Sequence, residues 1–294
     1  MPVQAMDDAS YITALYRHLL GRQPDAEGLS TWTTLLQQTG DPTAVMAGLL
    51  ASAEDRARNA IPTPASPAAE ALDGLEGRPV VVVDVGAQAL QFEDHVYGPL
   101  CTPAISHRII GFEPLLGKLN ERVSLGKGGD ALTMLPYAIG DGDRHVLHIN
   151  NDDATSSLFP LNPSLCRDYE HLVTLHTVDR VEIETRKLDD VLPPEAIDFL
   201  KLDIQGAELM ALMGAQNVLS RTAVIHCEVE FAPIYQGQPL YPDVQQLLNA
   251  AGFSLIDLIV PHLYAPLTAA GPVSQDRLLW ADAVFFQDSP GARG

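Results

Sequence analysis

Charged side chains at the ends of two predicted strands are the groups in this chain best placed to do chemistry. Lys201 and Asp203 alternate along one apolar run, and His226, Glu228 and Glu230 alternate along the next. Because successive side chains of a strand point to opposite faces, each set lies on one face. Charged groups in a buried sheet are costly unless they are paired or lie at a crevice. We therefore expect Asp203 and Glu228 to converge there, where a carboxylate can accept a proton or stabilise a positive charge.

The other polar side chains of these strands have structural interpretations. An ion pair within the strand layer is the favoured role for Lys201, and His226 is expected to be a core histidine with satisfied hydrogen bonds. A magnesium site is the alternative for the nearby carboxylates, since magnesium prefers oxygen ligands. These carboxylates belong to Asp203, Glu208, Glu228 and Glu230. No local ligand motif supports such a site, so no metal is predicted.

The stretch 78–89 must position the first part of the site. Four consecutive valines, at 80–83, are too apolar for a strand with one wet face and suit a central strand covered by helices on both sides. The run ends in Asp84, Val85 and Gly86, where the backbone should turn sharply. In open α/β sheets the ligand crevice lies at the carboxyl ends of the strands, so this ending indicates a nucleotide-like cofactor.

Strands and helices alternate through the rest of the chain. Their periodicity predicts strands at 106–112, 132–139, 197–203, 222–230, 253–260 and 281–287, and helices at 115–125, 207–219 and 242–251. Segments 144–150 and 181–188 alternate apolar and polar residues and are expected to form a hairpin on the edge of the sheet. The last two strands have no helical pattern between them, which predicts a second, antiparallel hairpin at one edge.

Composition divides the chain into three parts. Residues 1–59 carry helical periodicity and are expected to form a small helical module. Residues 60–78 are rich in proline and alanine and are expected to form a semi-stiff linker. Residues 79–294 carry the strand and helix alternation and form the α/β domain.

The helical module has a recognisable phrase. Residues 16–25, Tyr-Arg-His-Leu-Leu-Gly-Arg-Gln-Pro-Asp, are followed by Gly28 and Trp32. This phrase resembles a family of bacterial helical modules of unknown function that is related to phycobilisome linkers. The resemblance implies protein docking or targeting, although Tyr16 and Trp32 themselves are expected to be core residues.

Composition also excludes several classes of function. The chain has 38 acidic and 18 basic residues, a net charge of −20, and such a field repels phosphate backbones, so nucleic-acid binding is not expected. A neutral or cationic substrate fits this charge better. No apolar run approaches the ~20 residues of a membrane span, and no signal peptide is visible. The three cysteines, Cys101, Cys166 and Cys227, show no paired spacing, which favours reduced thiols and a cytoplasmic location.

Several blocks of the second part of the chain resemble the FkbM family of methyltransferases. The blocks lie at 83–87, 111–114, 138–141, 156–158, 201–208 and 228–231. The block 201–208, Lys-Leu-Asp-Ile-Gln-Gly-Ala-Glu, is specific, whereas the Asp-x-Gly block at 84–86 is not. The resemblance implies a Rossmann-like class I methyltransferase sheet, which carries an antiparallel edge hairpin, beside the small all-α N-terminal domain. It also implies S-adenosylmethionine as the cofactor and, in most members, O-methylation of a small molecule, sugar or peptide-linked metabolite.

The resemblance assigns candidate roles to individual residues. Glu113 follows the second strand, where a carboxylate can accept both ribose hydroxyls, and Gly86 lets the backbone approach the methionine part of the cofactor. Asp203 and Glu228 are the candidate catalytic residues. The candidate cofactor-binding residues are Asp84, Gly86, Ala87, Gln88, Glu113, Ala138, Ile139 and Asp203. The candidate substrate contacts, in the polar and proline-rich loops, are Ser156, Ser157, Tyr235 and Tyr241.

The loop after the first strand departs from the family pattern. The family usually shows Asp-x-Gly-Ala-Asn-x-Gly, whereas this chain has Gln88 in place of Asn and Leu90 in place of the second Gly. A catalytically silent binding module, which has lost the cofactor and docks through its helices, is therefore the rival hypothesis. A nicotinamide oxidoreductase is a third possibility, but the chain lacks GxGxxG and has the closing hairpin.

Overall fold

A computed structural model describes residues 8–16, 23–39, 45, 78–88, 95–125, 131–266 and 277–288. Two compact units are present, Met1–Glu76 and Gly77–Gly294, and each is described by itself. The predicted linker, apart from Arg78, lies outside the described residues, as does Leu90. Within the described ranges, no helix is long and apolar enough to cross a membrane.

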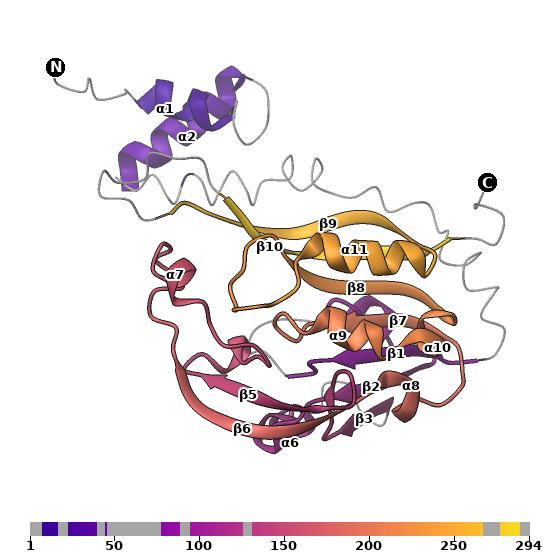
Figure 1. Cartoon of the computed structure of the whole chain (residues 1–294). Helices are drawn as coiled ribbons and strands as arrows, with labels where there is room; N and C mark the ends of the chain where they lie inside the picture. The colour runs from indigo at the N-terminus through magenta and orange to yellow at the C-terminus, as the bar shows by residue number, and fades with distance from the viewer. Residues whose placement is uncertain are drawn as a thin grey trace. The chain divides into compact units, whose positions relative to one another are not determined.

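The first unit contains helices α1 (Asp8–Leu15) and α2 (Ala26–Thr39), shown in Figure 1. The side chain of Asp25 accepts a hydrogen bond of 2.7 Å from the backbone N–H of Gly28, which satisfies a free donor in the first turn of α2. The apolar faces of these helices form a small core of buried residues with partly buried neighbours. Its members are Ile12, Tyr16, Leu36 and Val45, with Leu29, Trp32 and Leu35 packed against them.

The second unit is built on a seven-stranded sheet with the order β3-β2-β1-β7-β8-β10-β9 (Figure 1). Its strands are β1 (Val80–Val85), β2 (His107–Phe112), β3 (Leu132–Leu135), β7 (Ile197–Leu202), β8 (Thr222–Glu230), β9 (Phe253–Tyr264) and β10 (Arg277–Gln287). Neighbouring strands from β3 to β8 run parallel, and β10 is antiparallel to both β8 and β9. The predicted Rossmann-like sheet with an antiparallel edge hairpin is thereby confirmed.

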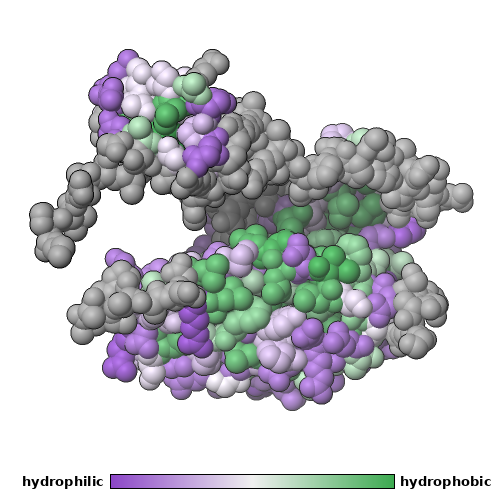
Figure 2. Space-filling model, turned by 90° about the horizontal axis from the view of Figure 1, so that it is seen from above, coloured by the Kyte–Doolittle hydropathy of each residue, from purple (hydrophilic) through white to green (hydrophobic). Residues whose placement is uncertain are grey.

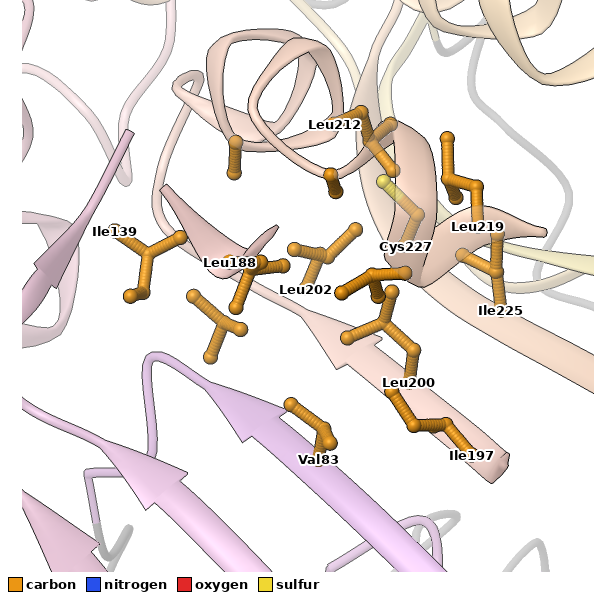
Figure 3. Packing of buried hydrophobic residues seen from close by; sticks show 14 of the residues in the cluster. Val83, Ile139, Leu188, Ile197, Leu200, Leu202, Leu212, Leu219, Ile225 and Cys227 are labelled. Atoms are coloured by element: carbon orange, nitrogen blue, oxygen red, sulfur yellow. The ribbon is translucent and has the colours of Figure 1, made fainter. Parts of the chain in front are cut away.

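One face of this sheet carries the main hydrophobic core. Side chains of β7 and β8 that alternate with the charged ones pack against the helices that follow in the chain, as Figure 3 shows for Leu200, Leu202, Ile225, Leu212 and Leu219. The helices of this layer are α8 (Leu188–Val191), α9 (Glu208–Met213), α10 (Gln216–Leu219) and α11 (Tyr241–Ala250). Helix α6 (Leu116–Ser124) follows β2. Because the core takes one set of alternating residues, the charged set is left for the opposite face.

Part of the chain departs from the predicted elements and forms a second sheet. The predicted strand 132–139 is wrong as one element, because it divides at Pro136 into β3 and β4 (Ala138–Ile139). A proline lacks the N–H that continues a ladder and restricts the residue before it. Strand β4 joins β6 (Thr177–Arg186) and β5 (Arg144–Asn150) in a three-stranded sheet with the order β4-β6-β5. The hairpin predicted for the edge of the main sheet therefore belongs to this smaller sheet.

Two further predictions needed correction. The helix predicted at 207–219 is interrupted at Gly214 and Ala215, where the chain packs closely against Gly140, so two short helices replace it. The final strands are longer than predicted, because β9 continues past Val260 to Tyr264. Near Val260, β9 has one residue more than β10 between two paired positions, and a register shift accommodates it. Val260 adopts a φ of 46° there.

Strand β9 forms one edge of the main sheet and exposes several apolar side chains. Ile256, Val260 and Leu263 are each at least half exposed. Figure 2 looks down on this edge and shows hydrophobic residues gathered across the middle of the domain. The same strand also supplies Ile259, Val260 and His262 to the lining of the cavity described next.

Candidate active site

A cavity of about 780 Å³ lies at the carboxyl ends of the parallel strands. This volume is within the range of small-molecule and cofactor sites. Its lining crosses the sheet from the β2 side, through β1 and β7, to β8, β10 and β9. We call the part lined by the loops after β1 and β2 and by β4 the β2 end. The part lined by β8, β10 and β9 is the β8 end.

The turn after β1 is held tightly between two neighbouring strands. Gly86 has a φ of 80°, which favours glycine, and a Cβ there would collide with the backbone carbonyl of Asp203. The backbone N–H groups of Gly86 and Ala87 both donate to the carbonyl oxygen of Phe112, at 3.1 and 3.0 Å. The turn is therefore fixed by backbone contacts. Gln88 extends from it into the cavity lining and donates to Asp153, at 3.2 Å.

Glu113 lies at the β2 end with its carboxylate almost fully buried. The backbone N–H of Leu115 donates to Oε1 at 2.8 Å, and among the described residues Oε2 makes no hydrogen bond. Burial raises the pKa of Glu113 to about 7. A buried carboxylate with an unused oxygen at a cavity wall is suited to accept hydrogen bonds from a bound ligand, and such bonds favour its charged form.

Asp84, at the end of β1, points into a buried polar network. Its side chain is only 1% exposed and accepts a 2.6 Å hydrogen bond from the hydroxyl of Tyr97. Arg122 donates to the same hydroxyl at 2.8 Å. Lys201 lies 3.5 Å from the other oxygen of Asp84. The predicted ion pair of Lys201 is therefore present in the structure, and Asp84 lies behind the cavity wall.

Asp203 and Glu228 converge at the cavity, as their positions on neighbouring strands predict. The amide nitrogen of Gln205 donates to both carboxylates, at 3.1 Å to Asp203 and 2.6 Å to Glu228. Lys201 donates to the second oxygen of Asp203 at 3.2 Å. Gln205 has a φ of 57° and accepts at its side-chain oxygen from the hydroxyl of Tyr235, 2.8 Å away. Non-glycine residues with positive φ cluster at functional sites, where the surroundings hold them in place.

The two carboxyl groups have opposite tendencies to ionise. Burial disfavours the Asp203 carboxylate, but the Lys201 ammonium and the Gln205 amide outweigh it and lower the pKa of Asp203. Burial, together with the charge of Asp203, raises the pKa of Glu228 well above its ordinary value. The negative charge of the pair is therefore favoured on Asp203 over Glu228.

Comparison with known proteins identifies the domain that contains this cavity. A family model described as the methyltransferase FkbM domain matches residues 84–255. The chain belongs to the FkbM methyltransferase family. A second model, a domain of unknown function (DUF4214), matches residues 3–59.

One curated relative is 2-O-methyltransferase NoeI from Sinorhizobium fredii (strain NBRC 101917 / NGR234). The two are 29% identical over 116 residues, which cover 37% of this chain and 48% of that protein. The alignment therefore spans about half the length of the relative.

Solved structures are similar at low identity. Magnesium protoporphyrin IX methyltransferase (ChlM) from Synechocystis PCC 6803 with bound SAM has 13% identity and a TM-score of 0.36, and the match covers 97% of this chain and 100% of that one. EvdMO1 has 11% identity and a TM-score of 0.33 and covers 75% of this chain and 40% of that one.

S-adenosylmethionine is the cofactor of this FkbM domain, and the residues present fit it. The ribose needs a hydrogen-bond acceptor, which Glu113 offers, and the adenine needs apolar walls, which Ala138 and Ile139 offer at the same end of the cavity. The positive sulfonium is compatible with the negatively charged Asp203 at the cavity wall. When bound, this cofactor supplies an electrophilic methyl group. Among the described residues, no group of three or more His, Cys, Asp or Glu is arranged to hold a metal ion.

The structure brings some predicted site residues to the cavity and not others. Ala87 is buried behind the turn, and Tyr235 is buried beneath Gln205. Tyr241 stacks on Phe231 with ring centroids 4.9 Å apart and packs on the core. The predicted residues that do line the cavity are Gly86, Gln88, Glu113, Ala138, Ile139, Ser156, Ser157, Asp203 and Glu228.

His226 is the main residue that sequence reasoning misjudged. It was expected to be a satisfied core histidine, yet it lines the cavity, and within the described part of the chain neither ring nitrogen makes a hydrogen bond. Its side chain is only 5% exposed, and burial lowers its pKa to about 4. Nε2 lies 3.7 Å from an oxygen of Asp282, a cavity residue on β10 that the sequence did not single out. The period-two pattern of His226 and Glu228 was the available signal, because it places both on one face.

Proposed function

We propose that this protein transfers the methyl group of S-adenosylmethionine to a hydroxyl oxygen of a small molecule, a sugar or a peptide-linked metabolite. The observation that carries the proposal is the pair of carboxyl groups of Asp203 and Glu228, both held by the Gln205 amide at the cavity wall. Membership of the FkbM family supports methyl transfer, and the relative named a 2-O-methyltransferase supports oxygen as the acceptor atom. No observation in the described residues favours the catalytically silent alternative.

Asp203 is the proposed general base. A hydroxyl is a poor nucleophile unless a base accepts its proton as the new bond forms. The carboxylate of Asp203 is about one-third exposed, which leaves it accessible from the cavity, and Lys201 keeps it ionised. The pKa of Glu228 is raised by burial and by the charge of Asp203, which favours Asp203 as the proton acceptor of this pair. Gln205 orients both groups, and Tyr235 orients Gln205.

Glu113 is the proposed ribose acceptor, and the turn at Gly86 and Gln88 is the proposed support for the methionine part. Ala138 and Ile139 are the proposed walls of the adenine site, and Ser156 and Ser157 are proposed substrate contacts. Ser157 also donates to the backbone oxygen of Gln205 at 2.6 Å and thereby holds the loop that presents Gln205.

The N-terminal module is proposed to dock to other proteins. Its match to a domain of unknown function and its small separate core support an independent role. We divide the chain into a helical module at 1–59, a linker at 60–78 and the methyltransferase domain at 79–294. The free thiols of Cys101, Cys166 and Cys227 support a cytoplasmic location, and the net charge of −20 argues against nucleic-acid partners.

Removal of the module tests this division. Residues 77–294 expressed alone should bind S-adenosylmethionine within about threefold of the full chain, since few contacts cross a boundary between domains. Calorimetric titration of both forms measures this. Aggregation of the shorter form, or a tenfold loss of affinity, would place the module within the folded methyltransferase unit.

The function itself is tested with the full-length protein. Calorimetric titration with S-adenosylmethionine, and with NAD as the contrasting ligand, should show binding of the first alone. Release of S-adenosylhomocysteine should then depend on added alcohols, and a parallel set of amines should not support it. Absence of S-adenosylmethionine binding at millimolar concentration would reject the proposal in favour of the silent module, and preference for amines would reassign the acceptor atom.

A further inference from the structure

His226 is an unusual residue for the wall of a cavity. Its side chain is 95% buried, yet neither ring nitrogen has a hydrogen-bond partner among the residues that the structure describes. Buried polar groups in folded proteins are nearly always paired, because an unpaired one loses its hydration without replacement. The cavity is the open side of this imidazole. A ligand in the cavity is therefore the natural source of the missing partners.

The strands next to His226 bring further polar groups to the same end of the cavity. Lys201 is its partner residue on β7, and Asp282 on β10 lies opposite Glu228 and diagonal to His226. His262 comes from β9, where the register shift at Val260 restores pairing with β10, and its ring stacks on Trp280 with centroids 4.7 Å apart. The β8 end is thus lined mostly by hydrogen-bonding side chains, in contrast to the β2 end.

We propose that the β8 end, with His226 and Asp282 as its anchor, binds the acceptor through hydroxyl groups other than the one that is methylated. The acceptor is then a polyhydroxylated ring, either a sugar residue or a cyclitol. This inference rests on the proposed function and adds the substrate class. Asp203 and Glu228 serve the hydroxyl that receives the methyl group, and His226 and Asp282 hold a second hydroxyl of the same molecule.

Geometry and hydrogen-bond chemistry both support a polyol. His226 and Glu228 are two residues apart on β8, so their Cβ atoms lie about 7 Å apart along the strand. That spacing is comparable to the separation of hydroxyls on opposite sides of a six-membered ring. A neutral imidazole has one donor and one acceptor nitrogen, and a hydroxyl can both accept and donate. A diol can therefore satisfy His226 and a neighbouring carboxylate at once.

The charge of the β8 end narrows the class of acceptor further. The ionisable groups that line this end are the acids Asp203, Glu228 and Asp282, the imidazoles of His226 and His262, and the ammonium of Lys201. Lys201 is already paired with Asp84 and Asp203. A ligand with a carboxylate or phosphate would be repelled by the negative charges of Asp203 and Asp282. Neutral polyols and amino sugars fit, and acidic sugars do not.

The test uses full-length protein and defined alcohols. Methyl glucopyranoside represents a sugar, myo-inositol represents a cyclitol, and cyclohexanol represents a ring of the same size with one hydroxyl. Release of S-adenosylhomocysteine gives kcat and KM for each. We expect at least one polyol to exceed cyclohexanol by tenfold or more in kcat/KM, and methyl glucuronide to fall well below methyl glucopyranoside. The comparison of methyl glucopyranoside with myo-inositol shows whether the acceptor is a sugar or a cyclitol.

His226→Phe separates a binding role from a structural one. Phenylalanine is close in size and removes both nitrogens, so the fold should survive and calorimetric affinity for S-adenosylmethionine should stay within twofold. We expect the KM for the polyol to rise at least tenfold with a smaller change in kcat. His176→Phe, at an exposed position outside the cavity, is the matched control and should leave both constants unchanged.

Three outcomes would overturn the inference. An unchanged KM in His226→Phe would make the residue structural, and equal use of cyclohexanol would remove the polyol class. Binding of S-adenosylmethionine without transfer to any of the polyols would also reject it, while the proposed function would still stand. Failure of the wild-type protein to bind the cofactor would reject the proposed function itself, so the two failures are distinguishable.

Discussion

The two ends of the cavity are built in different ways. At the β2 end the chain uses backbone geometry and one carboxylate, with Gly86 at a positive φ against Asp203 and with Glu113 buried beside Leu115. At the β8 end it uses side chains from three strands, and His226 and Asp282 meet there only because the strands pair in one register. A cofactor shared by many enzymes suits a backbone-built site, whereas an acceptor that differs between enzymes suits a site made of replaceable side chains.

Electrostatics also differs between the ends. Burial raises the pKa of Glu113 at the β2 end and lowers that of His226 at the β8 end. In both cases burial favours the neutral form, but only for Glu113 does the expected ligand restore the charge. His226 is expected to stay neutral and to act through hydrogen bonds. Asp203, between the ends, is the group that remains ionised.

The largest effect is expected from the group between the ends. Asp203→Asn preserves size and one acceptor oxygen but removes the charge and the ability to take a proton. Turnover should fall by about 10²–10⁴, the usual contribution of a general base, while cofactor affinity changes little. Single-turnover methylation and calorimetry on the same preparation measure both quantities.

An exposed carboxylate provides the control for this substitution. Asp143→Asn lies outside the cavity and should retain wild-type turnover. If Asp203 only neutralises Lys201, its asparagine variant will lose stability, and the molecules that remain folded will stay active. A stable variant with full turnover would exclude Asp203 as the base and make Glu228 the next candidate.

A smaller effect is expected at the β2 end. Glu113→Ala removes a buried acceptor that the cofactor ribose should use, and a charge-assisted hydrogen bond of this kind contributes about 1.5–3 kcal/mol. The affinity for S-adenosylmethionine should therefore fall roughly tenfold to hundredfold. Calorimetric titration at pH 8 measures the loss. The KM for the acceptor should be unaffected, and a change there would mean that the two ends are not separate sites.

The sequence predicted the β2 end better than the β8 end, for a physical reason. The valine run, Gly86 and the Glu113 position are local features, and each is readable within a few residues of the chain. His226 and Asp282 are 56 positions apart and meet through antiparallel pairing of β8 with β10, which no local pattern encodes. The convergence of Asp203 and Glu228 was predictable because parallel neighbours end at the same edge.

The errors in the fold have the same origin. Pro136 divides a continuous apolar run, and the tertiary destination of β4 could not be read from alternation alone. The extension of β9 depends on a positive φ at Val260, and a β-branched residue is a poor sequence signal for that conformation. The positions of the main-sheet strands along the chain followed from periodicity, whereas breaks and bulges depended on tertiary contacts.

His226→Phe also tests how the β8 end responds to pH. The folded pKa of His226, about 4, lies below the ordinary value of 6.5, so the wild-type protein loses stability as pH falls from 6.5 toward 4. At pH 5 this costs about 2 kcal/mol, since each pKa unit corresponds to ~1.4 kcal/mol. The free energy of unfolding of the variant, relative to that of the wild type, should therefore be about 2 kcal/mol higher at pH 5 than at pH 8. Urea unfolding at both pH values measures it, and an equal difference at the two would contradict the lowered pKa.

The affinity for S-adenosylmethionine is expected to depend on pH through Glu113 at the β2 end. Glu113 in the free protein has a pKa of about 7, and its charged form is the one that ribose hydroxyls should stabilise. Below pH 7, binding must first remove a proton, so affinity should rise up to about tenfold per pH unit between pH 5.5 and 7 and level off above. The folding stability of the cofactor-free protein depends on pH in the opposite direction. The raised pKa of Glu113 stabilises the folded state below pH 4.5, and this stabilisation is lost as pH rises through 7. Glu113→Gln, which keeps the acceptor for Leu115, should therefore bind more weakly at pH 8 and show no such rise. Titrations between pH 5.5 and 8.5 compare the two proteins, and a parallel rise in the glutamine variant would assign the proton to another group.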